Sequence, residues 1–127
     1  MMTIGIISMG AMGGPLAARL TRAGYRVLTQ DNRSEASKQR AVEAKVNQVS
    51  FPQLVESCDM FISVLPPSEA VNLAKSVAGF DGKQRIFADL NAISPKTSQA
   101  IAKTVSNAHW IYAEGTLSLF RNPFLYG

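Results

Sequence analysis

The chain contains few residues that form covalent cross-links or bind metals. Of its 127 residues, one is a cysteine, Cys58, and one is a histidine, His109. A single cysteine excludes a disulfide within the chain and any cysteine-based metal site, and it suits a reducing compartment. The histidine begins an expected strand, where a structural or exposed role fits better than a catalytic one. We therefore predict neither a disulfide-stabilised fold nor a metal centre.

Long hydrophobic runs are also absent. The longest apolar segments, residues 3–7 and 60–67, are far too short to cross a bilayer, and no basic stretch precedes an apolar one at the N-terminus. The net charge of +4 comes from lysines and arginines spread over several expected helices, without the dense basic run of a nucleic-acid-binding surface. We expect a cytoplasmic, single-domain protein with no membrane or nucleic-acid partner.

Short apolar segments alternate with helical patterns along the whole chain. Segments typical of strands occur at residues 3–7, 26–29, 46–49, 59–65, 85–90 and 109–113. The segments between them have helical spacing, and several begin with the serine or proline that favours a helix N-terminus. Strands that alternate with helices predict an α/β fold: a doubly wound, mainly parallel Rossmann sheet with helices on both faces.

The turn between the first strand and the first helix, residues 8–13, has the sequence SMGAMG. In such a turn a glycine at position 10 lets the backbone approach a pyrophosphate, and a glycine at position 13 lets the helix pack closely on the strand. The helix N-terminus adds free N–H donors and a partial positive charge. Ser8 replaces the first glycine of the GxGxxG pattern, so the turn by itself fits either a dinucleotide site or an ordinary loop.

Charged and polar residues follow the second expected strand. Asp31 lies about twenty positions beyond the glycines, where a dinucleotide site binds the adenosine ribose, and it favours NAD. Arg33 and Ser34 offer donors to a 2′-phosphate, which favours NADP. The alternative is that Ser34 caps the next helix and that the two charged residues are solvated. The choice between NAD and NADP stays open at this point.

Two later strands end in segments that reach the same edge of a parallel sheet. Leu65 and Pro66 follow the fourth strand, and their backbone is a candidate wall for a cofactor. The prolines also stiffen the connection to the next helix. Asn91 follows the fifth strand, where its amide is placed to contact the nicotinamide half of a cofactor or a substrate, or equally to brace its own loop.

Four segments, in this order, resemble a known family: GIISMGAMGGPLAARL, DNRS, CDMFISVLPPSEAV and FADLNAISPKT. They are similar to the N-terminal NAD(P)-binding domain of the β-hydroxyacid dehydrogenases, the 6-phosphogluconate and 3-hydroxyisobutyrate dehydrogenase superfamily. The resemblance covers roughly residues 2–113, and Asn91-Ala92 replaces the usual Ser-Thr before Ile-Ser-Pro. It implies a Rossmann domain at residues 1–113 that binds NADP(H), with NAD(H) as the alternative.

The resemblance also assigns roles to residues. It places the 2′ position of the adenosine at Arg33 and Ser34, and the nicotinamide near Asn91. The full set of predicted cofactor-binding residues is Met9, Gly10, Ala11, Met12, Gly13, Asp31, Arg33, Ser34, Leu65, Pro66 and Asn91. In the family, a lysine on a helix beyond the Rossmann domain is the general acid/base for hydride transfer with a small hydroxyacid. We match no residue to that lysine and predict no catalytic residue.

Residues 114–127 depart from the family, which continues with a glycine-rich substrate loop. Glu114-Gly115 is a candidate remnant of that loop, and we interpret the apolar tail after it as divergent or truncated. We favour a cofactor-binding domain of a hydroxyacid-dehydrogenase-like oxidoreductase that is incomplete as a single chain. The alternatives are a complete dehydrogenase, for which a general acid/base is missing, and a non-enzymatic interaction or regulatory domain that retains the fold.

Overall fold

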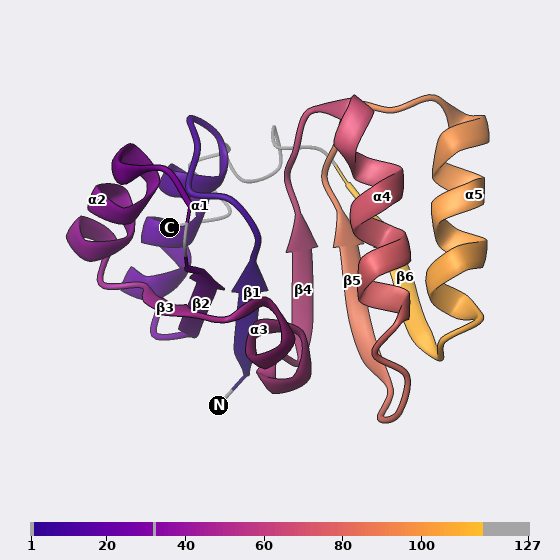
Figure 1. The fold of residues 1–127 in the computed structure, drawn as a ribbon, viewed down its shortest axis with the longest axis horizontal. Helices are drawn as coiled ribbons and strands as arrows, with labels where there is room; N and C mark the ends of the chain where they lie inside the picture. Colours follow the sequence, from indigo (N-terminus) through magenta and orange to yellow (C-terminus); the bar gives the residue numbers. More distant parts are fainter. Residues whose placement is uncertain (1, 32, 116–127) are drawn as a thin grey trace.

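The computed structural model describes residues 2–31 and 33–115, in which strands and helices alternate (Figure 1). The strands are β1 (Thr3–Ile6), β2 (Arg26–Gln30), β3 (Asn47–Val49), β4 (Met60–Ser63), β5 (Arg85–Asp89) and β6 (Trp110–Glu114). The helices are α1 (Gly13–Arg22), α2 (Glu35–Ala44), α3 (Phe51–Ser57), α4 (Pro67–Ala78) and α5 (Pro95–Ser106). Every strand expected from the sequence is present, with ends shifted by at most two residues, and helices occupy the segments between the strands as expected. Among the described residues, we find no helix with the length and apolar character that a membrane span needs.

The strands form one parallel sheet in the order β3-β2-β1-β4-β5-β6. The chain builds outward from β1 to β3, returns to the other side of β1 as β4, and then builds outward to β6. Where this direction reverses, between β1 and β4, the connections leave toward opposite faces and open a crevice at the carboxyl ends of the strands. The predicted doubly wound, parallel Rossmann fold is confirmed.

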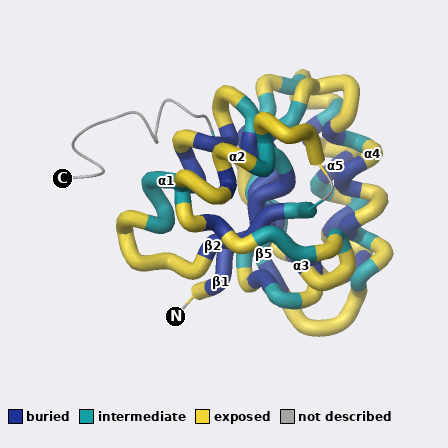
Figure 2. The backbone as a smooth tube through the Cα atoms, turned by 60° about the vertical axis from the view of Figure 1, so that its left-hand side comes forward, coloured by how far each residue is buried: buried dark blue, intermediate teal, exposed yellow. Residues whose placement is uncertain are grey.

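Different helices cover the two faces of the sheet. On one face, α3, α4 and α5 pack over Phe61 and Phe87, whose rings stack at 5.9 Å between centroids. On the other face, α1 and α2 pack over Ile4 and Ile6. Successive strand residues point to opposite faces, so the sheet supplies both cores. Figure 2 shows the result as buried strands between helices that are exposed on their outer sides.

In the described part of the chain, β5 and β6 have helices on one face only. Figure 1 shows α4 and α5 side by side in front of them. On the opposite face, Ile86 and Ala88 are half-buried and Ile111 is 47% exposed. This half of the sheet therefore presents apolar side chains that no described helix covers.

Serine side chains cap three of the helices. The hydroxyl oxygens of Ser34, Ser50 and Ser94 each accept a hydrogen bond from the backbone N–H three residues later, at the starts of α2, α3 and α5. Such a bond satisfies a donor that the helix leaves unpaired. The starts of α1 and α4 have no side-chain cap, and both lie beside the reversal between β1 and β4.

Two helices end in a residue with left-handed backbone. Gly24, after α1, has φ 99°, and Lys45, after α2, has φ 59°. Each is followed by a hydrogen bond that closes the helix end: Tyr25 N–H donates to the Leu20 carbonyl at 3.1 Å, and Val46 N–H donates to the Ala41 carbonyl at 2.9 Å. The two ends have the same geometry, but only Gly24 adopts it without strain.

We expect Lys45→Gly to raise the free energy of unfolding by about 0.5–1 kcal/mol, because a residue with a Cβ is strained in this conformation. Gly24→Ala, the reverse exchange at the matching position, should lower it by about 1 kcal/mol. Urea-induced unfolding of both variants measures the changes. A Lys45→Gly variant less stable than the wild type would show that the Lys45 side chain contributes more than its backbone strain costs.

Candidate functional site

A cavity of about 470 Å³ lies at the crevice between β1 and β4. Its walls come from the β1–α1 turn, the β4–α4 connection and the loops that follow β2 and β5. Seven of the eleven predicted cofactor-binding residues line it: Gly10, Ala11, Met12, Gly13, Arg33, Leu65 and Pro66. The tertiary structure thus brings together three segments that are far apart in the sequence. The other four predicted residues, Met9, Asp31, Ser34 and Asn91, lie outside the lining.

The two glycines of the turn serve different purposes. A Cβ on Gly13 would lie 2.0 Å from the Ser8 carbonyl oxygen, so the packing of α1 against the end of β1 requires glycine there. A Cβ on Gly10 would meet only the Ser8 Oγ, at 3.4 Å, and Gly10 has no left-handed backbone. Neither the fold nor the backbone therefore requires glycine at position 10. The space beside it fits a ligand backbone such as a pyrophosphate.

Ser8 makes the turn without the backbone freedom of glycine. The described residues with positive φ are Gly24, Lys45, Gly82 and His109, and Ser8 is not among them. A side chain at position 8 is therefore compatible with the turn, and the missing first glycine does not disrupt it.

The N-terminus of α1 faces the cavity, which Met12 and Gly13 line. Met12, the N-cap residue, gives no side-chain hydrogen bond, and the first turn of α1 contains no acidic residue. Gly14 N–H is bonded to the Gly10 carbonyl and Pro15 has no N–H, so the N–H of Gly13 and the helix dipole are what this end offers to a negative charge. The wall is thus suited to a phosphate group.

Asn91 braces the carboxyl ends of β4 and β5. Its Oδ1 accepts a hydrogen bond from Leu65 N–H at 2.6 Å, and its Nδ2 donates to Ser63 Oγ at 2.8 Å. Its own N–H donates to Asp89 Oδ1 at 2.9 Å. The sequence suggests a brace within the Asn91 loop, whereas the structure directs the amide to the β4 end and so holds Leu65 in place at the cavity. A contact between Asn91 and nicotinamide stays a prediction.

The three polar residues after β2 have different surroundings. Ser34 caps α2, accepting from Ser37 N–H at 3.2 Å, so the predicted cap is present. Arg33 is exposed at the cavity wall. Asp31 donates its N–H to the Val49 carbonyl at 2.7 Å, and its carboxylate has no partner among residues 2–31 and 33–115. Their predicted contacts with the adenosine ribose or a 2′-phosphate stay predictions.

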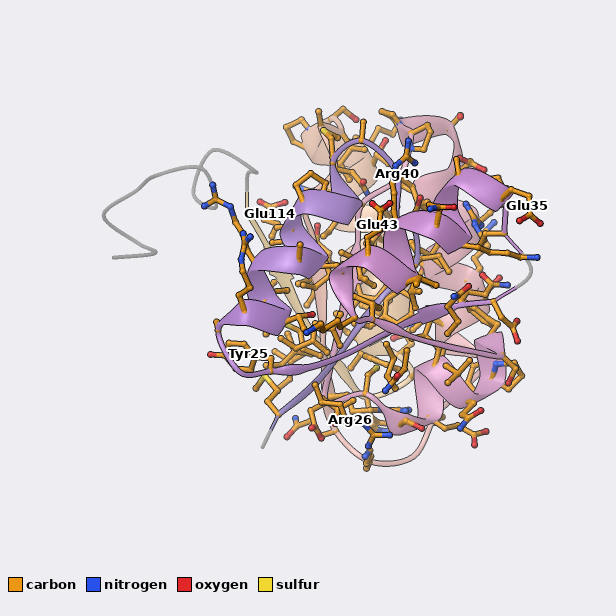
Figure 3. All side chains as sticks on the ribbon, turned by 90° about the vertical axis from the view of Figure 1, so that its left-hand side faces the viewer. Tyr25, Arg26, Glu35, Arg40, Glu43 and Glu114 are labelled. Carbon is orange, nitrogen blue, oxygen red and sulfur yellow. The ribbon has the colours of Figure 1, made fainter. Side chains whose placement is uncertain are left out.

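Arg40 is a residue of this region that the sequence does not reveal. Its Nη1 donates to the Met9 carbonyl at 3.1 Å, while the Met9 side chain is buried in the core under α1. With Glu43, Arg40 also lines a second cavity, of about 420 Å³, between α1 and α2. Figure 3 shows both side chains on α2 beside α1. The helical pattern of residues 34–44 does not reveal this contact, because it depends on how α2 packs against α1.

Polar side chains gather at the ends of β5 and β6. Asp89 is 2% exposed and lies opposite Glu114 in the parallel register. Burial raises the pKa of the Asp89 carboxyl, and the bond from Asn91 opposes this shift. Ser98 on α5 contacts the Tyr112 hydroxyl at 2.7 Å and also the Glu114 carboxylate. Glu114, a candidate remnant of a substrate loop, is the last residue of β6, and its carboxylate accepts a hydrogen bond from Ser98 on α5.

The chain is similar to known proteins over most of its length. A family model described as the NAD binding domain of 6-phosphogluconate dehydrogenase matches residues 3–114. The chain belongs to this family. Mitochondrial 3-hydroxyisobutyrate dehydrogenase of Bos taurus is 29% identical over 122 residues, which cover 91% of this chain and 35% of the bovine protein. The 3-hydroxyisobutyrate dehydrogenase of Pseudomonas aeruginosa is 29% identical over 114 residues, 84% of this chain and 37% of the relative.

A solved structure supports the same fold. The Mycobacterium tuberculosis 3-hydroxyisobutyrate dehydrogenase, determined with L-serine, superimposes with a TM-score of 0.82 at 24% identity, covering 91% of this chain and 40% of that chain. This chain spans about 35% of the length of the bovine relative. The predicted resemblance is confirmed: the chain is a dinucleotide-binding domain of the hydroxyacid-dehydrogenase type, for a nicotinamide dinucleotide. The boundary between residues 113 and 114 stays a prediction, and residues 116–127 lie outside the described part.

The glycine pair permits a test that separates folding from binding. Gly13→Ala should lower the free energy of unfolding by about 2 kcal/mol, because its Cβ cannot fit beside the Ser8 carbonyl. Gly10→Ala should change it by less than about 0.5 kcal/mol, yet weaken dinucleotide binding at least about tenfold by filling the approach to the backbone. Urea unfolding and fluorescence titration with NADH and NADPH measure the two effects. Unchanged binding by Gly10→Ala would place the pyrophosphate elsewhere.

Asp89 and Asp81 should respond to pH in opposite directions. Because burial raises the pKa of Asp89 above its ordinary 3.8, its contribution to stability is full below about pH 4 and is lost as the pH rises through the raised pKa. A hydrogen bond with His109 lowers the pKa of the exposed Asp81, so its contribution is present above about pH 4 and is lost on acidification.

From about pH 4 to about pH 8, the stability of Asp89→Asn should therefore improve relative to the wild type, since the variant has no buried charge to form. Asp81→Asn, the exposed control, should be less stable than the wild type above about pH 4, and this difference should shrink as the pH falls below about 4. Urea unfolding from about pH 3 to about pH 8 measures both effects. A stability difference for Asp89→Asn that does not change with pH would mean that Asp89 ionises without cost in the fold.

Proposed function

We propose that the chain binds NADP(H) in the 470 Å³ cavity and serves as the cofactor domain of an oxidoreductase acting on a small hydroxyacid. The observation that carries the choice of cofactor is the position of Arg33. Its side chain is exposed at the cavity wall, and no carboxylate pairs with it among the described residues. A free guanidinium in this position suits the fork-like binding of a phosphate.

The cavity walls suggest how the dinucleotide would lie. The pyrophosphate would rest beside Gly10 at the start of α1, where the backbone can be approached and the helix dipole favours a negative charge. The adenosine 2′-phosphate would meet Arg33, and the other half would run along Leu65 and Pro66 toward the loop of Asn91. When bound, the dinucleotide supplies the hydride. The described residues bind and orient it, and we assign none of them as the general acid/base.

Asp31 makes the cofactor choice a balance of charges. A free carboxylate at the end of β2 can accept hydrogen bonds from ribose hydroxyls, which favours NAD(H), and it repels a phosphate. Arg33 opposes that repulsion. A guanidinium can form two parallel hydrogen bonds to a phosphate of opposite charge, whereas a carboxylate accepts from neutral ribose hydroxyls, so we infer that Arg33 outweighs Asp31 for a ligand that carries the 2′-phosphate.

The hydroxyacid substrate class is a further part of the proposal. Two relatives are named 3-hydroxyisobutyrate dehydrogenase, and their identity of 29% extends over most of this chain. Because the matched part is about a third of each relative, the support concerns the cofactor domain more than the substrate pocket.

We expect NADPH to bind more tightly than NADH, and Arg33→Ala to weaken NADPH binding about tenfold or more, the effect of one charge-assisted hydrogen bond. Binding of NADH should change less than about twofold, since NADH lacks the 2′-phosphate. Calorimetric titration of the two cofactors measures both. Arg26→Ala is the matched control, because Arg26 is an exposed arginine at the opposite end of β2.

Two results would contradict the proposal. Tighter binding of NADH than of NADPH by the wild type would assign the site to NAD(H) and leave Asp31 as the deciding residue. An equal loss of both cofactors in Arg33→Ala would mean that Arg33 does not contact the 2′-phosphate.

A further inference from the structure

We propose that Arg40 is a positioning residue for the pyrophosphate-binding turn: from α2 it holds the Met9 carbonyl and so raises affinity for every nicotinamide dinucleotide. The inference rests on the proposed binding of a dinucleotide at this turn. Arg40 does not line the 470 Å³ cavity, so it would act through the turn and not by touching the cofactor.

The hydrogen bond from Arg40 reaches the turn at the residue before Gly10. Arg40 Nη1 lies 3.1 Å from the Met9 carbonyl oxygen, and Gly14 N–H holds the next carbonyl, that of Gly10, at 2.9 Å. One bond comes from α2 and the other from α1. Together they fix the peptide groups on both sides of the position where a pyrophosphate would approach.

The turn needs such support because it has little packing of its own. Gly10 and Ala11 line the 470 Å³ cavity on one side and the 420 Å³ cavity on the other, so this part of the turn is a thin wall between two open spaces. Gly10 has no side chain to pack. A backbone segment of this kind loses much conformational entropy when a ligand fixes it, and a contact that fixes it beforehand improves affinity.

Gly14 gives Arg40 the room to reach the turn. A Cβ on Gly14 would lie 3.5 Å from Arg40 Cδ and 3.3 Å from the Met9 carbonyl oxygen. The second contact is tighter than most Cβ contacts, so a methyl group there would force the Met9 carbonyl, the acceptor of the Arg40 bond, to shift slightly. The lack of a side chain at Gly14 on α1 therefore leaves room for Arg40 on α2 to bond to the Met9 carbonyl.

The positive charge of Arg40 also favours binding of the dinucleotide. Glu43 lines the same cavity, yet no ion pair joins it to Arg40; Glu43 Oε1 accepts a bond from Gln39 at 3.4 Å instead. An arginine without an acidic partner among the described residues adds positive potential behind the turn. Although Arg40 is exposed, this potential favours the doubly charged pyrophosphate on the other side.

Arg40 and Arg33 can be told apart by the ligands they affect. Arg33 would contact the 2′-phosphate, which only NADP(H) carries. Arg40 would act on the pyrophosphate, which NADPH, NADH and ADP-ribose share. Loss of Arg40 should therefore weaken all three ligands by the same factor, whereas loss of Arg33 should weaken NADPH alone.

The test is calorimetric titration of Arg40→Met and Arg40→Lys with NADPH, NADH and ADP-ribose. Arg40→Met keeps the aliphatic stem but removes the donors, and it should weaken each ligand about three- to tenfold, the range for one net hydrogen bond. Arg40→Lys keeps a charged donor and should restore each affinity to within about twofold of the wild type. A merely structural effect on α2 packing would not be rescued in this way.

The control is Lys38→Met, which removes a positive charge from the same helix, where Lys38 pairs with Glu35 at 3.4 Å. It should leave all three affinities unchanged. Gly14→Ala provides a second route to the same contact if Arg40→Met folds poorly. It should weaken the three ligands equally, and the double variant should lose less affinity than the two losses combined, because both changes break one interaction.

Several outcomes would overturn the inference. Arg40→Met and Gly14→Ala with wild-type affinities would show that the turn needs no support from α2. Loss of NADPH binding alone would make Arg40 a second contact of the 2′-phosphate. Failure of Arg40→Lys to restore binding would assign the effect to packing. If the wild type binds none of the three ligands, the proposed function itself fails, a result distinct from all of these.

Discussion

The close approach of α1 to the end of β1 is the constraint on which the candidate site depends. A side chain at Gly13 would collide with the Ser8 carbonyl, so the helix can begin where it does only because Gly13 has none. This contact aims the uncapped N-terminus of α1 at the crevice and leaves Gly10 beside open space. Gly13 is required by the fold, whereas Gly10, three residues earlier, leaves space for the ligand.

The reversal of strand order then determines which other segments face the cofactor. α1 and α4 begin on either side of it without side-chain caps, while serines cap α2, α3 and α5. A helix N-terminus that already has a capping oxygen offers fewer donors to a ligand. The β4 end is kept in position by Asn91, which satisfies the N–H of Leu65 immediately before two prolines that have no N–H to donate.

Arginines and acidic residues around the turn define its electrostatic character. Arg33 lines the 470 Å³ cavity on one side of the turn and Arg40 lines the 420 Å³ cavity on the other, while the Asp31 carboxylate follows β2. Figure 3 shows Arg40 on α2 beside α1, and Arg26, the first residue of β2, well away from it. Positive charge is therefore placed on both sides of the segment where phosphates would bind, and acidic residues oppose it: Asp31 after β2, Glu43 beside Arg40, and Glu69 in the cavity wall that also contains Arg33.

The sequence by itself determined the order and type of every described strand and helix, because the apolar period and the capping serines are local signals. It also identified the glycine turn, because the residues that define this turn are consecutive in the sequence. The roles of Asn91 and Arg40 were decided only by the tertiary structure. Asn91 bonds across to β4, and Arg40 reaches the Met9 carbonyl from another helix. Neither contact leaves a local pattern, since each arises from packing between segments that are about thirty residues apart, and spacing along one element cannot report such packing.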